Sequence, residues 1–209
     1  MARLKVPITD EFPYHVSARS HNKERFPVPM DVLWQIFSDE LQFTVKAFNL
    51  HVHCFVLMSN HFHLLASCPE ANLSEAMAWF MRETAKKVNH LSGHINQLWG
   101  GRFFRSQIQS YHYFLNVKKY VYRNPVEAGI CNFVEEYEYS TINGLLGLSR
   151  LTIEAHDYDT IENTETALIW LNRSANQDYC EYIRKGLRRK VFKLPKVNRA
   201  DNPLEKELL

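Results

Sequence analysis

The sequence has no long apolar run and no obvious cysteine framework. No stretch approaches the roughly 18 apolar residues that a membrane-spanning helix needs, so we expect no membrane partner. Met1–Lys5 has no apolar segment behind it, so we expect no signal peptide. The four cysteines are far apart and match neither a zinc site nor a secreted disulfide framework: Cys54, Cys68, Cys131 and Cys180. Reduced thiols in a cytosolic protein are the expectation.

What the chain does contain is enough apolar material for a packed core. Its 209 residues suit one domain, or one domain with an appendage, and 45% of them are hydrophobic. The net charge is only +2, but eight of the 16 positions in Arg184–Arg199 are basic and none is acidic. Such a block can bind a polyanion, or it can be a solvated helix followed by a tail.

Alternating and helical patterns divide the chain into strands and helices. We expect strands at Tyr14–Arg19, Leu50–Met58, His61–Ser67 and Phe103–Gln109, and helices at Asp31–Phe48, Leu73–Leu91, Tyr111–Asn124, Asn163–Leu171 and Gln177–Val191. Pro125 should end the third helix, because the residue before a proline is disfavoured in the α region. This order predicts an α+β fold in which helices cover an antiparallel sheet.

The strand expected at His61–Ser67 begins with two histidines that flank a phenylalanine, His61-Phe62-His63. Side chains at i and i+2 of a strand share a face, so both imidazoles would point at one spot. Imidazole is a common ligand of divalent metal ions. Such a pair is more often structural than a metal site, so a partner elsewhere in the chain is needed.

A possible partner lies about 60 residues later, on the third expected helix. Tyr120 and Asn124 are four residues apart and therefore lie on one helix face. If that face docks against the strand, two imidazoles and an amide oxygen could bind a cation beside a phenol. Such a set fits metal-assisted phosphoryl transfer through a covalent tyrosine intermediate. Each residue alone also has an ordinary interpretation, as a core tyrosine and a helix-end asparagine.

A second pair of histidines, at His51–His53, lies just upstream. If Ser59-Asn60 is a two-residue hairpin loop, Met58 pairs with His61. Directly paired residues share a sheet face, so His51–His53 would then lie on the face opposite His61–His63. A slip of one residue reverses this assignment. We predict the register set by the two-residue loop. We therefore predict that His51 and His53 are not metal ligands.

Five blocks of the sequence resemble the HUH single-tyrosine transposases, in which U is a bulky apolar residue. The blocks occur in order and with suitable spacing at Tyr14–Arg19, Leu57–Leu65, Gly101–Ser106, Tyr120–Gly129 and Tyr137–Thr141. The subgroup that the chain resembles most is the REP-associated tyrosine transposases, domesticated relatives of insertion-sequence transposases. The resemblance implies a ferredoxin-like HUH nuclease core in residues 1–150, followed by a helical, basic C-terminal extension in residues 151–209.

Residue by residue, the resemblance implies a nucleophile and three metal ligands. Tyr120 corresponds to the nucleophile, and His61, His63 and Asn124 correspond to ligands of Mg²⁺ or Mn²⁺. Tyr122 is a decoy, because it lies roughly 200° around the helix from Tyr120. The implied activity is a metal-dependent single-stranded DNA endonuclease and strand transferase. It would act on hairpin-containing DNA and leave a 5′-phosphotyrosine and a free 3′-hydroxyl.

Binding of single-stranded DNA requires a cationic groove with aromatic faces for stacking. The candidates are Arg102, Phe103, Phe104 and Arg105 in the block Gly101–Ser106, Lys118, Lys119 and Arg123 around the nucleophile, and Arg82, Lys86 and Lys87 on the helix expected at Leu73–Leu91. We expect Arg102 and Arg105 to matter most, because the resembling block carries them. The expected partner is single-stranded or hairpin DNA, bound by a monomer or homodimer in the bacterial cytoplasm at the nucleoid.

Two other functions are compatible with the same residues. A domesticated descendant could recognise DNA hairpins without cutting them, and would then bind DNA but form no adduct. A small metallohydrolase could use the histidines and a water molecule, and would then tolerate loss of Tyr120. The spacing of Tyr120 and Asn124 favours the transposase hypothesis over both.

Overall fold

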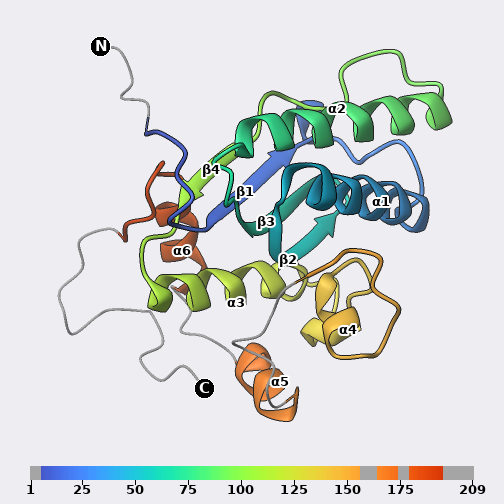
Figure 1. The fold of residues 1–209 in the computed structure, drawn as a ribbon. Helices are drawn as coiled ribbons and strands as arrows, with labels where there is room; N and C mark the ends of the chain where they lie inside the picture. Colours follow the sequence, from blue (N-terminus) through green and yellow to red (C-terminus); the bar gives the residue numbers. More distant parts are fainter. Residues whose placement is uncertain (1–5, 156–163, 174–178, 195–209) are drawn as a thin grey trace.

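A computed structural model describes residues 6–155, 164–173 and 179–194. A four-stranded antiparallel sheet in the order β2-β3-β1-β4 lies between two layers of helices (Figure 1). The strands are β1 (Tyr14–Arg19), β2 (His51–Met58), β3 (His61–Ser67) and β4 (Phe104–Gln107). The helices are α1 (Met30–Phe48), α2 (Leu73–Ser92), α3 (Tyr111–Glu127), α4 (Thr141–Leu145), α5 (Thr164–Asn172) and α6 (Tyr179–Leu187), with short 3₁₀ turns at His21–Lys23 and Val134–Glu136. The predicted α+β fold is confirmed.

The two faces of the sheet have separate hydrophobic clusters. On one face α1 and α2 cover buried aromatic side chains, among them Phe62 of β3. On the other face α3, α5 and α6 pack over Leu65 of β3 and Val56 of β2. Alternation along β3 therefore sends Phe62 to one cluster and His61 and His63 toward α3. No helix in the described ranges is long and apolar enough to cross a membrane.

Most predicted elements lie within a few residues of their observed bounds, but α3 does not end at Pro125. The helix continues to Glu127, with Pro125 inside it. Proline removes the N–H that would bond the carbonyl of Val121. The Asn124 side chain compensates in part, because its Nδ2 donates to the carbonyls of Tyr120 at 2.7 Å and Val121 at 3.4 Å. The chain then leaves the helix through Gly129, whose φ of +67° suits glycine.

The predicted hairpin register is confirmed near the turn but not along the whole of β2. Met58 pairs with His61 and Val56 with His63. An irregularity between Val52 and Cys54 then inserts His53 as an extra residue.

This irregularity reverses the sheet face of the second pair of histidines. His51 pairs with Ser67, on the face of β3 that carries His63. His53 hydrogen-bonds the Ser67 hydroxyl at 2.7 Å and packs edge-on against Phe114 of α3. The prediction that His51 and His53 lie on the opposite face is therefore wrong.

Candidate active site

Strands β1 and β3 and helix α3 bring three histidines and one tyrosine together. The ring centroids of His61 and His63 are 5.1 Å apart, and those of His63 and Tyr120 are 5.8 Å apart. His15, on β1, places its Nε2 2.9 Å from Nδ1 of His63. The docking of α3 against β3, which was the condition of the metal-site hypothesis, is therefore observed, and His15 joins the group.

Burial keeps these histidines neutral. It lowers the pKa of His15 to about 3, and with help from the positive charge of Arg19 it lowers the pKa of His61 to about 4. The pKa of His63 is also well below its usual value, first through burial and then through the neighbouring His15 and His61. Neutral imidazoles keep a nitrogen lone pair near pH 7, as a metal ligand must.

The side chain of Asn60 fixes which nitrogen of His61 carries the proton. Its Nδ2 donates to the carbonyl of Lys23 at 2.6 Å, which orients the amide, since a carbonyl only accepts. Its Oδ1 therefore faces Nδ1 of His61 at 2.6 Å, and that nitrogen must be the donor. Nε2 of His61 is left with its lone pair, as in metal sites where an outer hydrogen bond orients a histidine ligand.

This arrangement predicts a measurable tautomer. In the protein without added metal, long-range ¹H–¹⁵N NMR near pH 7 should show His61 protonated on Nδ1. Asn60→Ala removes the acceptor and should convert His61 to a mixture of tautomers, while His53, far from the change, keeps its signal. Metal affinity should fall by about 10- to 100-fold in the variant. Protonation of His61 on Nε2 in the wild-type protein would contradict the argument.

Tyr120 is nearly buried, with 5% of its surface exposed. Burial raises the pKa of its phenol, and a hydrogen bond and positive charge from Arg184 of α6 oppose that rise. Tyr122 points elsewhere, into the core, and its hydroxyl lies 3.3 Å from Oγ1 of Thr141. The structure thus separates the two tyrosines as the helical spacing predicted.

Asn124 lies beside Tyr120, and among the described residues its side chain is not hydrogen-bonded to His61 or His63. Its Nδ2 is committed to backbone carbonyls, so Oδ1 is the atom that it can offer to a cation. Within the ranges that the structure describes, no three His, Cys, Asp or Glu side chains are grouped as a metal site. Two neutral imidazoles and an amide oxygen nevertheless fit a divalent cation chemically. Asn124 as third ligand stays a prediction.

Two adjoining hollows open around these side chains. The larger, of about 490 Å³, lies beside His61 and is bordered by residues 17–20 of β1 and its following turn and by Gly100–Arg102. The smaller, of about 260 Å³, lies beside Tyr120 and α6. Ser17, His63 and Phe104 border both hollows. We call the pair the active-site cleft.

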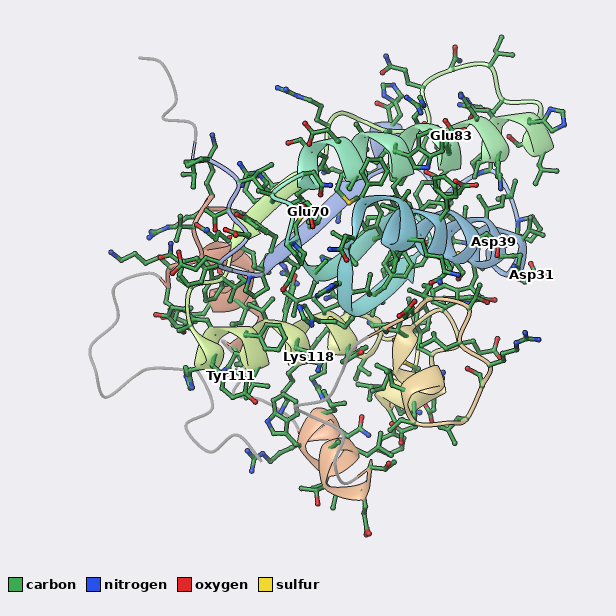
Figure 2. The ribbon with its side chains drawn as sticks, viewed as in Figure 1. Asp31, Asp39, Glu70, Glu83, Tyr111 and Lys118 are labelled. Carbon is green, nitrogen blue, oxygen red and sulfur yellow. The ribbon has the colours of Figure 1, made fainter. Side chains whose placement is uncertain are left out.

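Among the residues that the structure describes, every charged one that borders the active-site cleft is basic. They are Arg19, Lys23 and Arg102 in the larger hollow and Arg184 and Arg188 in the smaller. Figure 2 shows the labelled carboxylates Asp31, Asp39, Glu70 and Glu83 on the layer of α1 and α2, which covers the other face of the sheet. The cleft therefore suits a polyanion.

The residues of the block Gly101–Ser106 that were predicted to contact DNA differ in position. Arg102 is exposed and borders the cleft. Phe103 packs against the core of α1 and α2, whereas its neighbour Phe104 is 40% exposed and borders both hollows. Arg105 donates to the carbonyl of Val6 at 2.6 Å, and its guanidinium lies 5.4 Å from the centroid of the Tyr14 ring. Arg102 and Phe104 are thus the available contacts.

Four other basic residues predicted to contact DNA lie outside the cleft, and their role stays a prediction. Lys118 and Lys119 are buried, with their amino groups near the rings of Phe114 and Trp170. Arg123 is also buried and donates to Glu127 and to the carbonyls of Leu171 and Asn172, which ties α3 to α5. Lys86 is exposed and pairs with Glu83, but on the opposite helical layer.

Sequence reasoning assigned no role in the site to His15, Arg184 or Arg188. His15 lies in the first resembling block, so its proximity to β3 was open to prediction. Arg184 and Arg188 were visible only as part of the basic run at the C-terminal end. Their four-residue spacing, within the helix expected at Gln177–Val191, was the available signal, since such spacing places two side chains on one helix face. In the structure Arg188 directly follows α6.

Comparison with known proteins agrees with this geometry. The family described as "Transposase IS200 like" matches residues 11–124, more than half of the chain. The chain belongs to this family of transposases. A REP-associated tyrosine transposase of Escherichia coli strain K12 is 26% identical over 92 residues, which are 44% of this chain and 54% of that relative. The match thus spans about half the length of the curated relative.

Two solved structures are similar to this chain, to different degrees. A structure of a REP-associated tyrosine transposase bound to a REP hairpin matches with a TM-score of 0.58 and 18% identity, covering 76% of this chain and 94% of that one. A putative transposase from Deinococcus radiodurans has a TM-score of 0.40 over 58% of this chain, also at 18% identity. The first match supports the fold assignment, while the second is too distant to support an argument.

Proposed function

We propose that the protein is a metal-dependent single-stranded DNA endonuclease and strand transferase that acts on hairpin-containing DNA. The observation that carries this proposal is the placement of Tyr120 against His63 in a cleft whose charged lining residues, in the described part of the chain, are all basic. A binding protein needs the charges but not a tyrosine beside two neutral imidazoles. A hydrolase that uses water does not need the tyrosine.

In the proposed reaction the oxygen of Tyr120 attacks the scissile phosphorus and the bond from phosphorus to O3′ breaks. The phenolic proton is lost to solvent, and the leaving O3′ takes a proton from solvent. The DNA is then joined to Tyr120 through a 5′-phosphate, and the other fragment ends in a 3′-hydroxyl. Attack by that or another 3′-hydroxyl reverses the step and transfers the strand.

The chain's own residues orient the strand for this reaction. His61, His63 and Asn124 would hold a divalent cation, Mg²⁺ or Mn²⁺, which supplies Lewis-acid stabilisation of charge on the phosphate. Arg19 and Arg102 border the larger hollow and would bind neighbouring phosphates of the strand. Phe104 presents an exposed ring between the hollows on which an unpaired base can stack.

Hairpin DNA is the proposed substrate because a protein of the same fold was solved bound to a REP hairpin. The test is incubation with labelled hairpin DNA carrying single-stranded flanks and Mn²⁺, followed by denaturing electrophoresis. A DNA-linked protein band stable in detergent supports the proposal. Tight binding without that band would favour the non-catalytic binding protein, and cleavage without it would favour the metallohydrolase.

The basic cleft also predicts a salt-dependent affinity. The logarithm of the association constant for such a hairpin should fall linearly with the logarithm of salt concentration. Arg102→Gln should reduce the slope by about one. Lys86→Gln is the matched control, because Lys86 lies on the opposite layer, and its slope should equal that of the wild type. Fluorescence anisotropy across a salt series measures both, and a flat wild-type line would contradict DNA binding by this surface.

A further inference from the structure

Helix α6 brings an arginine to the proposed nucleophile from outside the residues that match the family. The match ends at residue 124, whereas α6 spans Tyr179–Leu187. We propose that Arg184 is a catalytic residue of this site, whose guanidinium holds the Tyr120 oxygen and the scissile phosphate side by side. The inference rests on the proposed function and adds a residue that the matched region does not contain.

The position of Arg184 is fixed from both ends of α6. At its start, the hydroxyl of Tyr179 donates to the carbonyl of Asn116 on α3 at 2.6 Å. Beyond its end, the chain adds to the sheet edge, since Phe192 N–H donates to the carbonyl of Gln107 at 2.8 Å and Gln107 N–H donates to Lys190 at 2.9 Å. Between these anchors Ile183 is fully buried against α3. Helix α6 is therefore held against α3 and β4 by hydrogen bonds near both ends and by buried packing between them.

The direction of Arg184 suits a role in phosphoryl transfer. Arg184 and Tyr120 border the same smaller hollow, and the guanidinium lies close enough to the phenol to oppose the rise in its pKa. Arg188, the first residue after α6, borders that hollow too. A guanidinium has five N–H donors in a plane, so it can donate to the Tyr120 oxygen and to phosphate oxygens at the same time. The acidic group nearest in sequence, Glu181, pairs with Lys185 at 2.6 Å, and both are half exposed.

The surroundings of Arg184 differ from those of Arg123, which has a structural role. Arg123 is 6% exposed, and its guanidinium donates to Glu127 and to the carbonyls of Leu171 and Asn172. The last two bonds join α3 to α5. Arg184 is exposed and borders the smaller hollow beside the hydroxyl of Tyr120. The N–H groups of a structural arginine such as Arg123 are bonded within the core, whereas N–H groups of Arg184 can donate to a substrate in the hollow.

The test compares adduct formation and DNA affinity in Arg184→Gln, Arg184→Lys and Lys185→Gln. Arg184→Gln should slow adduct formation at saturating DNA by about 100-fold, in the range for loss of one aligned donor, while Kd rises less than tenfold. Arg184→Lys should recover part of the rate, because it keeps the charge but not the fork. Lys185→Gln, on the same helix but paired with Glu181, should react at the wild-type rate. Circular dichroism melting checks that each variant folds.

The outcomes separate this inference from the proposed function. Adduct formation by Arg184→Gln within about threefold of wild type, or a loss confined to Kd, would overturn the role of Arg184 and leave the proposed function standing. Absence of any wild-type adduct would overturn the proposed function and the catalytic role together. Equal losses in Arg184→Gln and Lys185→Gln would show a general effect of charge and would also overturn the assignment.

Discussion

Replacing Tyr120 by phenylalanine should reduce formation of the covalent protein–DNA adduct by at least about 10³-fold, because the change deletes the attacking oxygen. The ring remains, so its packing against His63 and the surrounding cluster is retained. DNA affinity should therefore stay within a few-fold of wild type. Labelled hairpin DNA and denaturing electrophoresis measure the adduct, and anisotropy measures the affinity.

Tyr122→Phe is the matched control, two residues away on the same helix. It removes a buried hydroxyl that lies 3.3 Å from Thr141, so it should lower the free energy of unfolding by about 1 kcal/mol. Its adduct should form at the wild-type rate. An adduct that persists in Tyr120→Phe and disappears in Tyr122→Phe would show that the other tyrosine is the nucleophile.

Replacing His63 by alanine should lower cleavage by about 100-fold or more, because the change removes a proposed metal ligand. His61→Ala should have a similar effect that is partly relieved by raising Mn²⁺, since a weakened site fills at higher concentration. His51→Ala is the comparison within the same pair of strands. His51 shares the sheet face of His63 but borders neither hollow, so its replacement should leave cleavage unchanged.

Cleavage assays over a Mn²⁺ series distinguish the two pairs of histidines. Full activity of His61→Ala and His63→Ala without added metal would contradict the ligand assignment. Loss of activity in His51→Ala at unchanged stability would mean that the metal site extends to the upstream pair.

The sequence predicted those parts of the site that depend on local periodicity. The alternation of β3 placed His61 and His63 together, and the four-residue spacing placed Tyr120 and Asn124 on one face of α3. The face of His51 and His53 was mispredicted because one extra residue at His53 reverses the parity of the strand, and nothing in the local composition marks such a bulge.

Other features depend on contacts between distant segments. Lys118 and Lys119 are buried because α5 and the rest of the α3 layer cover them, and charged side chains carry no local sign of such burial. Arg184 reaches Tyr120 only because Tyr179 and Phe192 anchor α6 to α3 and β4. The continuation of α3 through Pro125 depends on the side chain of Asn124, which replaces part of the missing backbone bond.

The central claim is that Tyr120 joins the protein to the 5′ end of a cut strand. The most direct measurement uses hairpin DNA labelled separately on each side of the cut, trypsin digestion of the adduct and tandem mass spectrometry. Trypsin should release the peptide Tyr120–Arg123, which contains both tyrosines and whose fragments distinguish them. We expect the 3′-side label on Tyr120 through a 5′-phosphate. Attachment to Tyr122, attachment through a 3′-phosphate, or no linked peptide at all would contradict the claim.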